Sequence, residues 1–179
     1  MTRILVLGVA AAIAASGGWA GEPALAVVEH VDLERYLGTW YEIASYPAWF
    51  QKNCTGVTAQ YGVRDDGLIS VVNSCRRGSL EGDLKQATGR AKVVDATTNA
   101  RLKVSFFWPF WGDYWIIDLD PEYRWAVVGV PSRKYLWVLS RTPTLDETLL
   151  REIVGRLPAK GYAPDRLNRT LQPGAPADR

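Results

Sequence analysis

The chain has 179 residues, enough for one domain with a substantial core. Hydrophobic residues make up 47% of it and charged residues 22%, a balance typical of a globular protein and not of a disordered one. The formal net charge is only +2, and Lys and Arg are not clustered, which argues against a nucleic-acid partner.

Residues 1–26 have the pattern of a secretory signal peptide. Arg3 precedes an apolar run over residues 4–13, and small residues follow it up to Ala20 and again up to Ala26. Such a run is too short to serve as a mature membrane anchor. We therefore expect export with cleavage after residue 20 or 26, a folded domain over residues 27–172 and a flexible tail over residues 173–179.

Apolar and polar residues alternate along most of the chain between residues 40 and 140, which indicates β-strands with one buried face. Short turns such as Arg64–Gly67 and Asp120–Glu122 separate the alternating runs. The predicted strands cover residues 40–46, 57–63, a run from residue 69, 87–93, 101–106, 114–119, 125–130 and 135–140.

Eight consecutive strands with short connections predict an all-β fold, an up-and-down antiparallel barrel. Closing the sheet removes its exposed edges, and eight strands leave an interior wide enough for one small ligand. The inward face of the strand at 87–93 carries Ala87, Gly89, Ala91 and Val93. Small inward residues leave space that a solid core would fill with larger side chains.

The stretch FFWPFWGDYW, Phe106 to Trp115, is the most unusual segment, because seven of its ten residues are aromatic. Strand direction places the residues after Phe106 at the open end of the barrel, the mouth, opposite the turn at residues 64–67. We expect Phe107–Trp111 to form a loop over the entrance, where it acts as a lid for a ligand. The alternative is that these aromatic side chains form a dimer surface.

One helix is predicted after the last strand. Thr144 can cap its N-terminus, and Glu147 completes a capping box. Leucine, isoleucine and valine residues recur at helical spacing up to Leu157, and Pro158 and Gly161 end the pattern. This apolar stripe should pack on the outside of the barrel.

Both cysteines, Cys54 and Cys75, lie in the mature chain, where an oxidising compartment permits a disulfide. A hairpin centred on Asp66 places Cys75 opposite Val57, so a bend at Cys54 is needed before the two sulfur atoms can meet. We predict a Cys54–Cys75 disulfide that ties the first loop to the rim of the barrel.

Three segments carry a resemblance to a known family. Gly38–Ile43 resembles the G-x-W motif that opens the first strand of lipocalins, and Leu136–Pro143 resembles their last-strand motif, which ends in an Arg, here Arg141. Between them, residues 104–129 are similar to bacterial lipocalins of the outer-membrane lipoprotein type, relatives of apolipoprotein D. The turn at Leu119–Tyr123 departs from the usual Thr-Asp-Tyr of the family. The resemblance implies a lipocalin domain whose cup binds fatty acids, lysophospholipids or similar lipophilic molecules.

The bacterial relatives are often lipid-anchored through a cysteine after the signal peptide, and this chain has no cysteine there. We therefore expect a soluble protein, periplasmic or secreted, that is not lipid-anchored, with association with the outer membrane left open.

Trp40 begins the first strand and Arg141 ends the last, and these strands are neighbours in a closed barrel. Their ends should meet at its closed base, where the guanidinium can lie over the indole. We assign both residues a structural role. Glu42 shares a face with Trp40, and it is expected either to be buried with a raised pKa or to bond to Asn73.

The residues expected to contact a ligand line the inward face or the mouth. They are Ala44, Tyr46, Ala59, Tyr61, Val71, Asn73, Ala91, Val104, Phe106, Phe110, Trp111, Tyr114, Ile116, Val128, Tyr135 and Trp137.

Catalysis is not expected. The one histidine, His30, precedes the first strand, so no Ser-His or Cys-His pair can form in the cup, and no metal-ligand spacing is present. No catalytic residue, metal or cofactor is therefore predicted, and the expected partner is a small lipophilic ligand. Two alternatives are an envelope interaction protein that uses its aromatic rim, and a less favoured enzyme with Cys54 or Cys75 as nucleophile. A homodimer and peripheral contact with membrane lipid are also left open.

Overall fold

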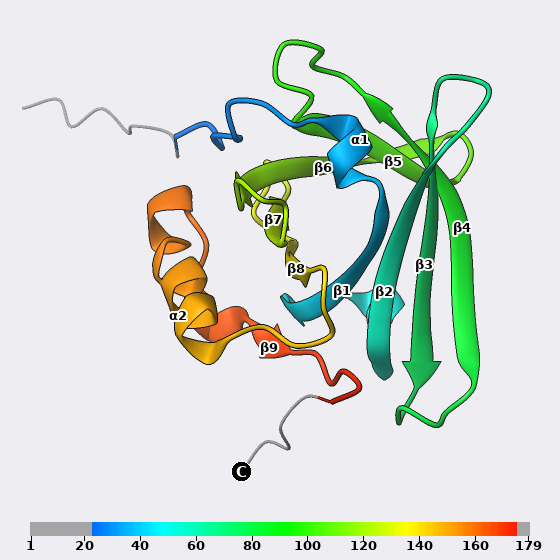
Figure 1. Ribbon diagram of the computed structural model, residues 1–179, viewed down its shortest axis with the longest axis vertical. Coiled ribbons are helices and arrows are strands. Elements are labelled where there is room, and N and C mark those ends of the chain that lie inside the picture. The colour runs from blue at the N-terminus through cyan, green and yellow to red at the C-terminus, as the bar shows by residue number, and fades with distance from the viewer. Residues whose placement is uncertain (1–22, 175–179) are drawn as a thin grey trace, which may run out of the picture.

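The computed structural model describes residues 23–174, so residues 1–22 of the predicted signal peptide and residues 175–179 of the predicted tail lie outside the described residues. The chain forms a barrel of antiparallel strands in sequence order (Figure 1). They are β1 (Gly38–Ser45), β2 (Cys54–Val63), β3 (Ile69–Arg77), β4 (Leu84–Val93), β5 (Arg101–Phe107), β6 (Phe110–Leu119), β7 (Trp125–Gly129) and β8 (Leu136–Ser140). Because β1 pairs with both β8 and β2, the sheet closes on itself, which confirms the predicted up-and-down barrel.

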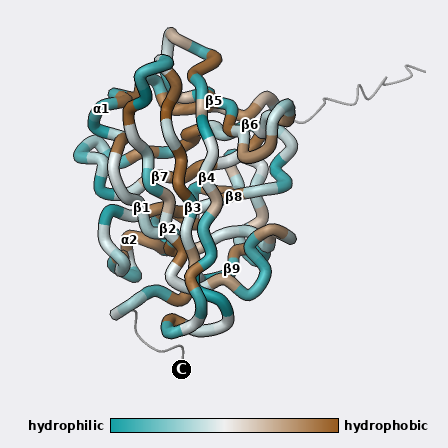
Figure 2. Tube along the Cα trace, turned by 90° about the vertical axis from the view of Figure 1, so that its right-hand side faces the viewer, coloured by the Kyte–Doolittle hydropathy of each residue, from teal (hydrophilic) through white to brown (hydrophobic). Residues whose placement is uncertain are grey.

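The alternating sequence of β2, β3 and β4 produces their two-faced packing, and hydrophilic and hydrophobic segments alternate along these strands in Figure 2. The predicted turn between β2 and β3 is present. Gly67 has a φ of +77°, which favours glycine, and the Asp66 carboxylate accepts hydrogen bonds from Arg64 and from the backbone N–H of Leu68.

Helix α2 (Glu147–Gly155) packs on the outside of the barrel, beside β7 and β8, as predicted (Figure 1). Its Leu150 and Ile153 side chains are buried in a cluster with outward-facing residues of the sheet. The N-cap is Asp146 and not Thr144, because the Asp146 carboxylate accepts the N–H of Leu149 at 2.9 Å. The helix therefore begins two residues later than predicted. Glu147 is its first residue and does not complete a capping box with Thr144.

Several short elements are absent from the sequence-based prediction. Helix α1 (Leu33–Tyr36) lies over the closed end of the barrel, and Asp32 caps it (Figure 1). The others are η1 (Trp49–Gln51), η2 (Pro158–Lys160), η3 (Pro164–Arg166) and β9 (Asn168–Arg169), which pairs with β1.

Residues 168–172 complete the wall between β1 and β2. The β1–β2 ladder stops at the pair Tyr41 and Thr58, toward the mouth. Beyond that pair, the Gln172 side-chain N–H₂ donates to the carbonyls of Glu42 and Val57, both at 2.8 Å. The C-terminal segment thus bridges a seam that the two strands leave unpaired.

The residues that precede α1 pack against the barrel. Leu25 is only 3% exposed and belongs to the same outer cluster as Ile153. Arg133 donates to the carbonyl of Pro23 at 2.6 Å. No helix within residues 23–174 is long and apolar enough to cross a membrane.

Candidate functional site

The inner face of the barrel brings together most of the predicted ligand residues. Strand register and packing place them around one cluster with Trp40 at its base. They are Ala59, Tyr61, Val71, Asn73, Ala91, Val104, Phe106, Tyr114, Ile116, Val128 and Trp137.

This inner face is open toward the mouth. Val104, Tyr114 and Trp137 point inward but are only half-buried, and Ala87 is exposed although it lies opposite the inward-facing Asn73. The space expected beside Gly89 is partly occupied, because a Cβ atom at that position would lie 2.8 Å from the Phe106 ring. The interior is therefore accessible near the mouth and packed by Phe106 further down.

Three tyrosine hydroxyls form a hydrogen-bonded cluster on this inner face. The Tyr61 hydroxyl donates to that of Tyr114 at 2.8 Å, and the Tyr36 and Tyr114 hydroxyls are also 2.8 Å apart. Burial raises the pKa of Tyr61 to about 12 and holds the pKa of Tyr36 and of Tyr114 well above 10.0. The three neutral hydroxyls carry three protons for two hydrogen bonds, so one proton remains to be donated.

Asn73 supplies an acceptor on the same face. Its Oδ1 atom is buried and has no hydrogen-bond partner among residues 23–174. A buried acceptor without a partner is costly, whereas a ligand that donates to it would relieve that cost. The inner face thus offers both a hydroxyl proton and a carbonyl oxygen to the polar end of a ligand.

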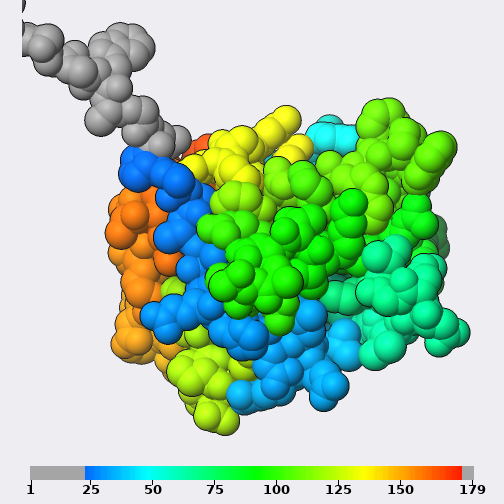
Figure 3. All heavy atoms as spheres, turned by 90° about the horizontal axis from the view of Figure 1, so that it is seen from above, coloured from blue at the N-terminus to red at the C-terminus, as the bar shows by residue number. Residues whose placement is uncertain are grey.

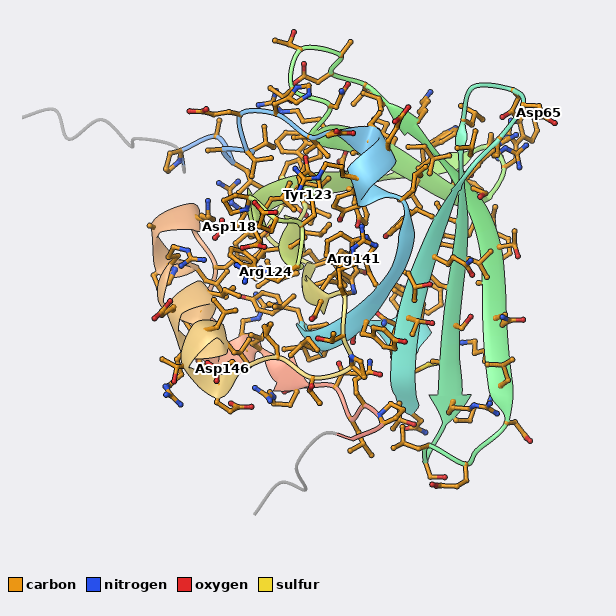
Figure 4. All side chains as sticks on the ribbon, viewed as in Figure 1. Asp65, Asp118, Tyr123, Arg124, Arg141 and Asp146 are labelled. Atoms are coloured by element: carbon orange, nitrogen blue, oxygen red, sulfur yellow. A yellow bond between two sulfur atoms is a disulfide. The ribbon has the colours of Figure 1, made fainter. Side chains whose placement is uncertain are left out.

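The closed end is sealed by Arg141 and Trp40. The guanidinium carbon of Arg141 lies 3.8 Å from the centre of the Trp40 ring, the contact expected from the barrel's geometry. Arg141 also donates to the carbonyl of Thr39 at 3.0 Å and to that of Tyr123 at 3.3 Å (Figure 4). The Arg141 donors are thus engaged by the backbone of the barrel floor, which supports a structural role.

Glu42 forms a network at the mouth that the sequence did not predict. Its carboxylate is buried and accepts hydrogen bonds from Ser45 (2.9 Å), Gln51 (2.7 Å) and Thr170 (2.6 Å), so its partner is not Asn73. Gln51 in turn accepts from the indole N–H of Trp137 at 3.0 Å. A pocket of about 430 Å³ lies beside this network, lined by the end of β1, residues 46–49 and 51–54, Val57 and residues 168–170.

Two predicted ligand residues lie outside the barrel. A bulge in β1 between Glu42 and Ala44 adds one residue, so Ala44 turns to the outer face and packs in the cluster with α2. Tyr46 follows it outward, and its hydroxyl donates to the carbonyl of Ala163 at 2.8 Å. The expectation that Ala44 and Tyr46 line the cup is therefore corrected.

The aromatic stretch is a tight hairpin and not a loop folded over the entrance. Only Trp108 and Pro109 lie between β5 and β6, and Phe110 at the tip is 76% exposed. Trp111 faces outward from β6, with the Lys92 ammonium 4.5 Å and the Arg90 guanidinium 5.6 Å from its ring centre. Trp111 therefore does not lie over the mouth as expected, and Phe110 stands exposed at the edge of the mouth and does not cover it.

Tyr135 does lie at the mouth, just before β8. Its ring packs between those of Phe50 and Trp137, with centroids 5.6 Å and 5.8 Å away. Phe50 and Tyr135 thus connect the first loop to the inner wall.

The predicted disulfide is present. The Cys54 and Cys75 sulfur atoms are 2.07 Å apart and the Cα atoms 5.4 Å apart. The bend expected near Cys54 is a bulge in β2 between Thr55 and Thr58. In the disulfide neither sulfur is a free nucleophile.

Residues 23–174 contain no group of three His, Cys, Asp or Glu side chains that could hold a metal ion. His30 is exposed on the segment before α1.

Comparisons with known proteins agree with this architecture. A family model described as a lipocalin-like domain matches residues 31–172. The chain is 44% identical over 149 residues to the outer membrane lipoprotein Blc of Escherichia coli K12, covering 83% of this chain and 84% of that protein. It is 32% identical over 163 residues to apolipoprotein D of Mus musculus, covering 86% and 84%. Insecticyanin from the tobacco hornworm Manduca sexta has the same fold, with a TM-score of 0.66 at 18% identity over 83% of this chain and 84% of that one.

The names of the bacterial relatives overturn one prediction. Proteins 43–44% identical to this chain, from Escherichia coli, Citrobacter freundii and Vibrio cholerae, are named outer membrane lipoproteins. The expectation of a soluble protein that is not lipid-anchored is therefore wrong. It rested on a missing cysteine, and the absence of one attachment residue is too weak a basis for excluding the membrane.

The closed eight-stranded barrel, the Trp40–Arg141 contact at its floor and a family match over most of the described residues lead to one conclusion. The chain belongs to the lipocalin family.

Proposed function

We propose that this protein binds a small lipophilic ligand in its barrel and carries or stores it in the cell envelope. The observation that supports this most is the inner face, which is apolar and still accessible near the mouth. Lipocalin relatives support the same use of the barrel.

The proposed ligand is a fatty acid, a lysophospholipid or a similar molecule with one hydrocarbon chain. Burying ten methylene groups contributes about 8 kcal/mol, and immobilising a flexible chain offsets several of those. Dissociation constants on the order of micromolar are expected. The tyrosine cluster and the Asn73 carbonyl oxygen could orient a hydroxyl or a protonated carboxyl group.

The site of action that we propose is the envelope near the outer membrane. The bacterial relatives are named for that location, and their identity to this chain supports the same location here. A lipid carrier at this place would take up its ligand from, or deliver it to, a lipid surface.

Replacing Ala91 by Trp tests the binding site. Ala91 is 3% exposed, lies opposite Ile69 and Val104, and points into the barrel. A Trp side chain there should fill the interior, so the folded variant should no longer take up a fluorescent fatty acid. Native mass spectrometry after lipid extraction would identify the natural ligand of the unmodified protein.

Thr88→Trp is the matched control, because Thr88 is exposed on the same strand. It should leave fatty-acid uptake unchanged while adding the same side chain. Full uptake by the Ala91→Trp variant, with a native circular dichroism spectrum, would contradict binding inside the barrel.

The second candidate function is interaction through the exposed aromatic side chains of the β5–β6 hairpin. This function predicts that the Ala91→Trp variant still binds the partner of the hairpin, because Ala91 lies inside the barrel. A cysteine-dependent enzyme is not supported, because Cys54 and Cys75 are joined in the disulfide.

A further inference from the structure

The mouth of the barrel carries an exposed aromatic rim, which we define as Trp49, Phe50, Phe107, Trp108 and Phe110. Phe107, Trp108 and Phe110 are 79%, 77% and 76% exposed, and Trp49 is 80% exposed. Figure 3 shows the cyan segment around residue 50 and the light-green hairpin around residues 107–110 along the same edge of the molecule. Large apolar side chains gathered on one surface mark an interaction site.

The charges of the barrel are divided between its two ends. The loops and strand ends at the mouth, residues 46–53, 76–85, 107–110 and 130–135, hold six basic and two acidic side chains, a net charge of +4. The closed end, residues 27–37, 64–68, 94–100, 120–124 and Arg141, holds four basic and eight acidic side chains, a net charge of −4. The small net charge of the whole chain thus conceals a strong polarity along the barrel.

Basic side chains stand directly beside the aromatic ones at the mouth. The Lys85 ammonium donates to the carbonyl of Phe50 at 3.1 Å, and the Lys134 ammonium lies 5.3 Å from the centre of the Tyr135 ring. Lys52 follows η1 and is exposed. Aromatic rings next to long cationic side chains suit the boundary between lipid headgroups and hydrocarbon.

We propose that the mouth docks on an anionic lipid surface, with the aromatic rim inserted among the headgroups and the mouth cations against the phosphates. Phe107, Trp108 and Phe110 stand at a two-residue turn, so this part of the rim protrudes enough to enter a bilayer interface. The same surface would repel the acidic closed end. The charge distribution therefore both attracts the protein to the lipid surface and turns its mouth toward that surface. The docking extends the proposed function, because it presents the mouth to the lipid phase, but it does not require a bound ligand.

A second copy of the chain fits this surface less well. Two mouths that face each other would bring net charges of +4 and +4 together. A mouth set against the closed end of the next copy would match the charges but would generate an open chain of molecules and not a closed dimer. The charge pattern therefore favours a lipid surface.

The test measures binding of the purified protein to sedimented vesicles of phosphatidylglycerol or of phosphatidylcholine. We expect binding to the anionic vesicles only, and weaker binding as salt rises. The double variant Trp108→Ser, Phe110→Ser should bind about tenfold or more weakly, since it removes the inserted apolar area. Lys52→Glu and Lys134→Glu should each weaken binding about fivefold or more.

Val63→Ser is the matched control, because Val63 is 81% exposed but lies at the end of β2, next to the acidic turn of the closed end. It should bind anionic vesicles as the unmodified protein does. Equal binding to both kinds of vesicle, or unchanged binding by the double variant, would overturn the proposal.

Two further measurements separate this proposal from its competitors. A dimer in sedimentation velocity that the double variant loses would assign the rim to a second copy. Fatty-acid uptake in vesicle-free buffer should be the same for the double variant and the unmodified protein. Loss of vesicle binding with uptake intact therefore tests docking alone, whereas failed uptake by the unmodified protein would contradict the proposed function alone.

Discussion

Trp111 and Trp137 lie on opposite faces of the barrel wall, although both were expected to contact the ligand. Trp137 faces inward, stacks on Tyr135 and donates its indole N–H to Gln51. Trp111 faces outward between Arg90 and Lys92. Alternation continued back from the inward-facing Tyr114 would have placed Trp111 outside, but Phe107–Trp111 was expected to form a loop over the entrance. The sequence contained the information, and the turn was simply shorter than expected.

Replacing each of these residues by Ala separates the two faces. Trp137→Ala should weaken the binding of a fluorescent lipid by about 1–3 kcal/mol, the scale of a lost buried aromatic contact. Trp111→Ala should leave both affinity and the rates of uptake and release unchanged, because its ring does not reach the interior. Fluorescence titration and stopped-flow exchange measure the two variants, and faster exchange by Trp111→Ala would contradict the outward placement.

The partners of Glu42 illustrate what a residue pattern cannot predict. Alternation correctly places Glu42 on the face of Trp40, but its donors Gln51 and Thr170 come from η1 and from the C-terminal segment. These residues lie 9 and 128 positions away along the chain, and no local periodicity relates them. Only the path of the folded chain brings them together.

At the scale of the strands, turns and alternation predicted most of the barrel, whereas the bulges were not predictable. A bulge adds one residue, so two consecutive residues face the same side: Ile43 and Ala44 of β1 both face outward, and so do Ile117 and Asp118 of β6. Ile116 packs inside and Ile117 packs against α2. In β1 the bulge sends Ala44 outward, and no turn residue in the sequence indicates the change.

The disulfide joins the bulged start of β2 to the end of β3. Its two cysteines are 21 positions apart, and a loop of this length restricts the unfolded chain enough to stabilise the fold by about 3 kcal/mol. The double variant Cys54→Ser, Cys75→Ser should therefore have a free energy of unfolding that is lower by about 3 kcal/mol, and it should unfold at a lower denaturant concentration. Chemical denaturation followed by tryptophan fluorescence measures the difference.

Thiol titration of the denatured, unreduced protein provides the control for that comparison. It should detect no free thiol. Two titratable thiols together with unchanged stability of the double variant would show that the bond does not form in solution.

At the scale of the whole molecule, the buried tyrosines link stability to alkaline pH. Burial raises the pKa of Tyr61 and of Tyr162 to about 12, compared with 10.0 for an exposed tyrosine. Between these values the unfolded chain loses phenolic protons that the folded barrel keeps, so the free energy of unfolding falls as pH rises from about 10 to 12. Below pH 10 this contribution is fully present. For Tyr61, two pKa units correspond to about 3 kcal/mol.

Denaturant unfolding at a series of alkaline pH values measures this loss. In Tyr61→Phe the hydrogen bond to Tyr114 is missing, so the variant starts from a lower stability. Its stability should nevertheless decline less steeply above pH 10, because one of the displaced ionisations is gone. Parallel pH profiles for the two proteins would argue against the burial of that hydroxyl.

The seam between β1 and β2 determines the order in which the barrel can form. Hairpins such as β2–β3 and β5–β6 use neighbouring residues and can assemble as soon as their strands are available. Gln172, however, bridges Glu42 and Val57 from 130 and 115 positions further along the chain. A chain delivered N-terminus first must therefore leave the edges of β1 and β2 unbridged near the mouth until Gln172 has arrived. Before β8 arrives and pairs with β1, the growing chain is an open sheet with a free edge, which is the stage at which a holding chaperone would protect it best.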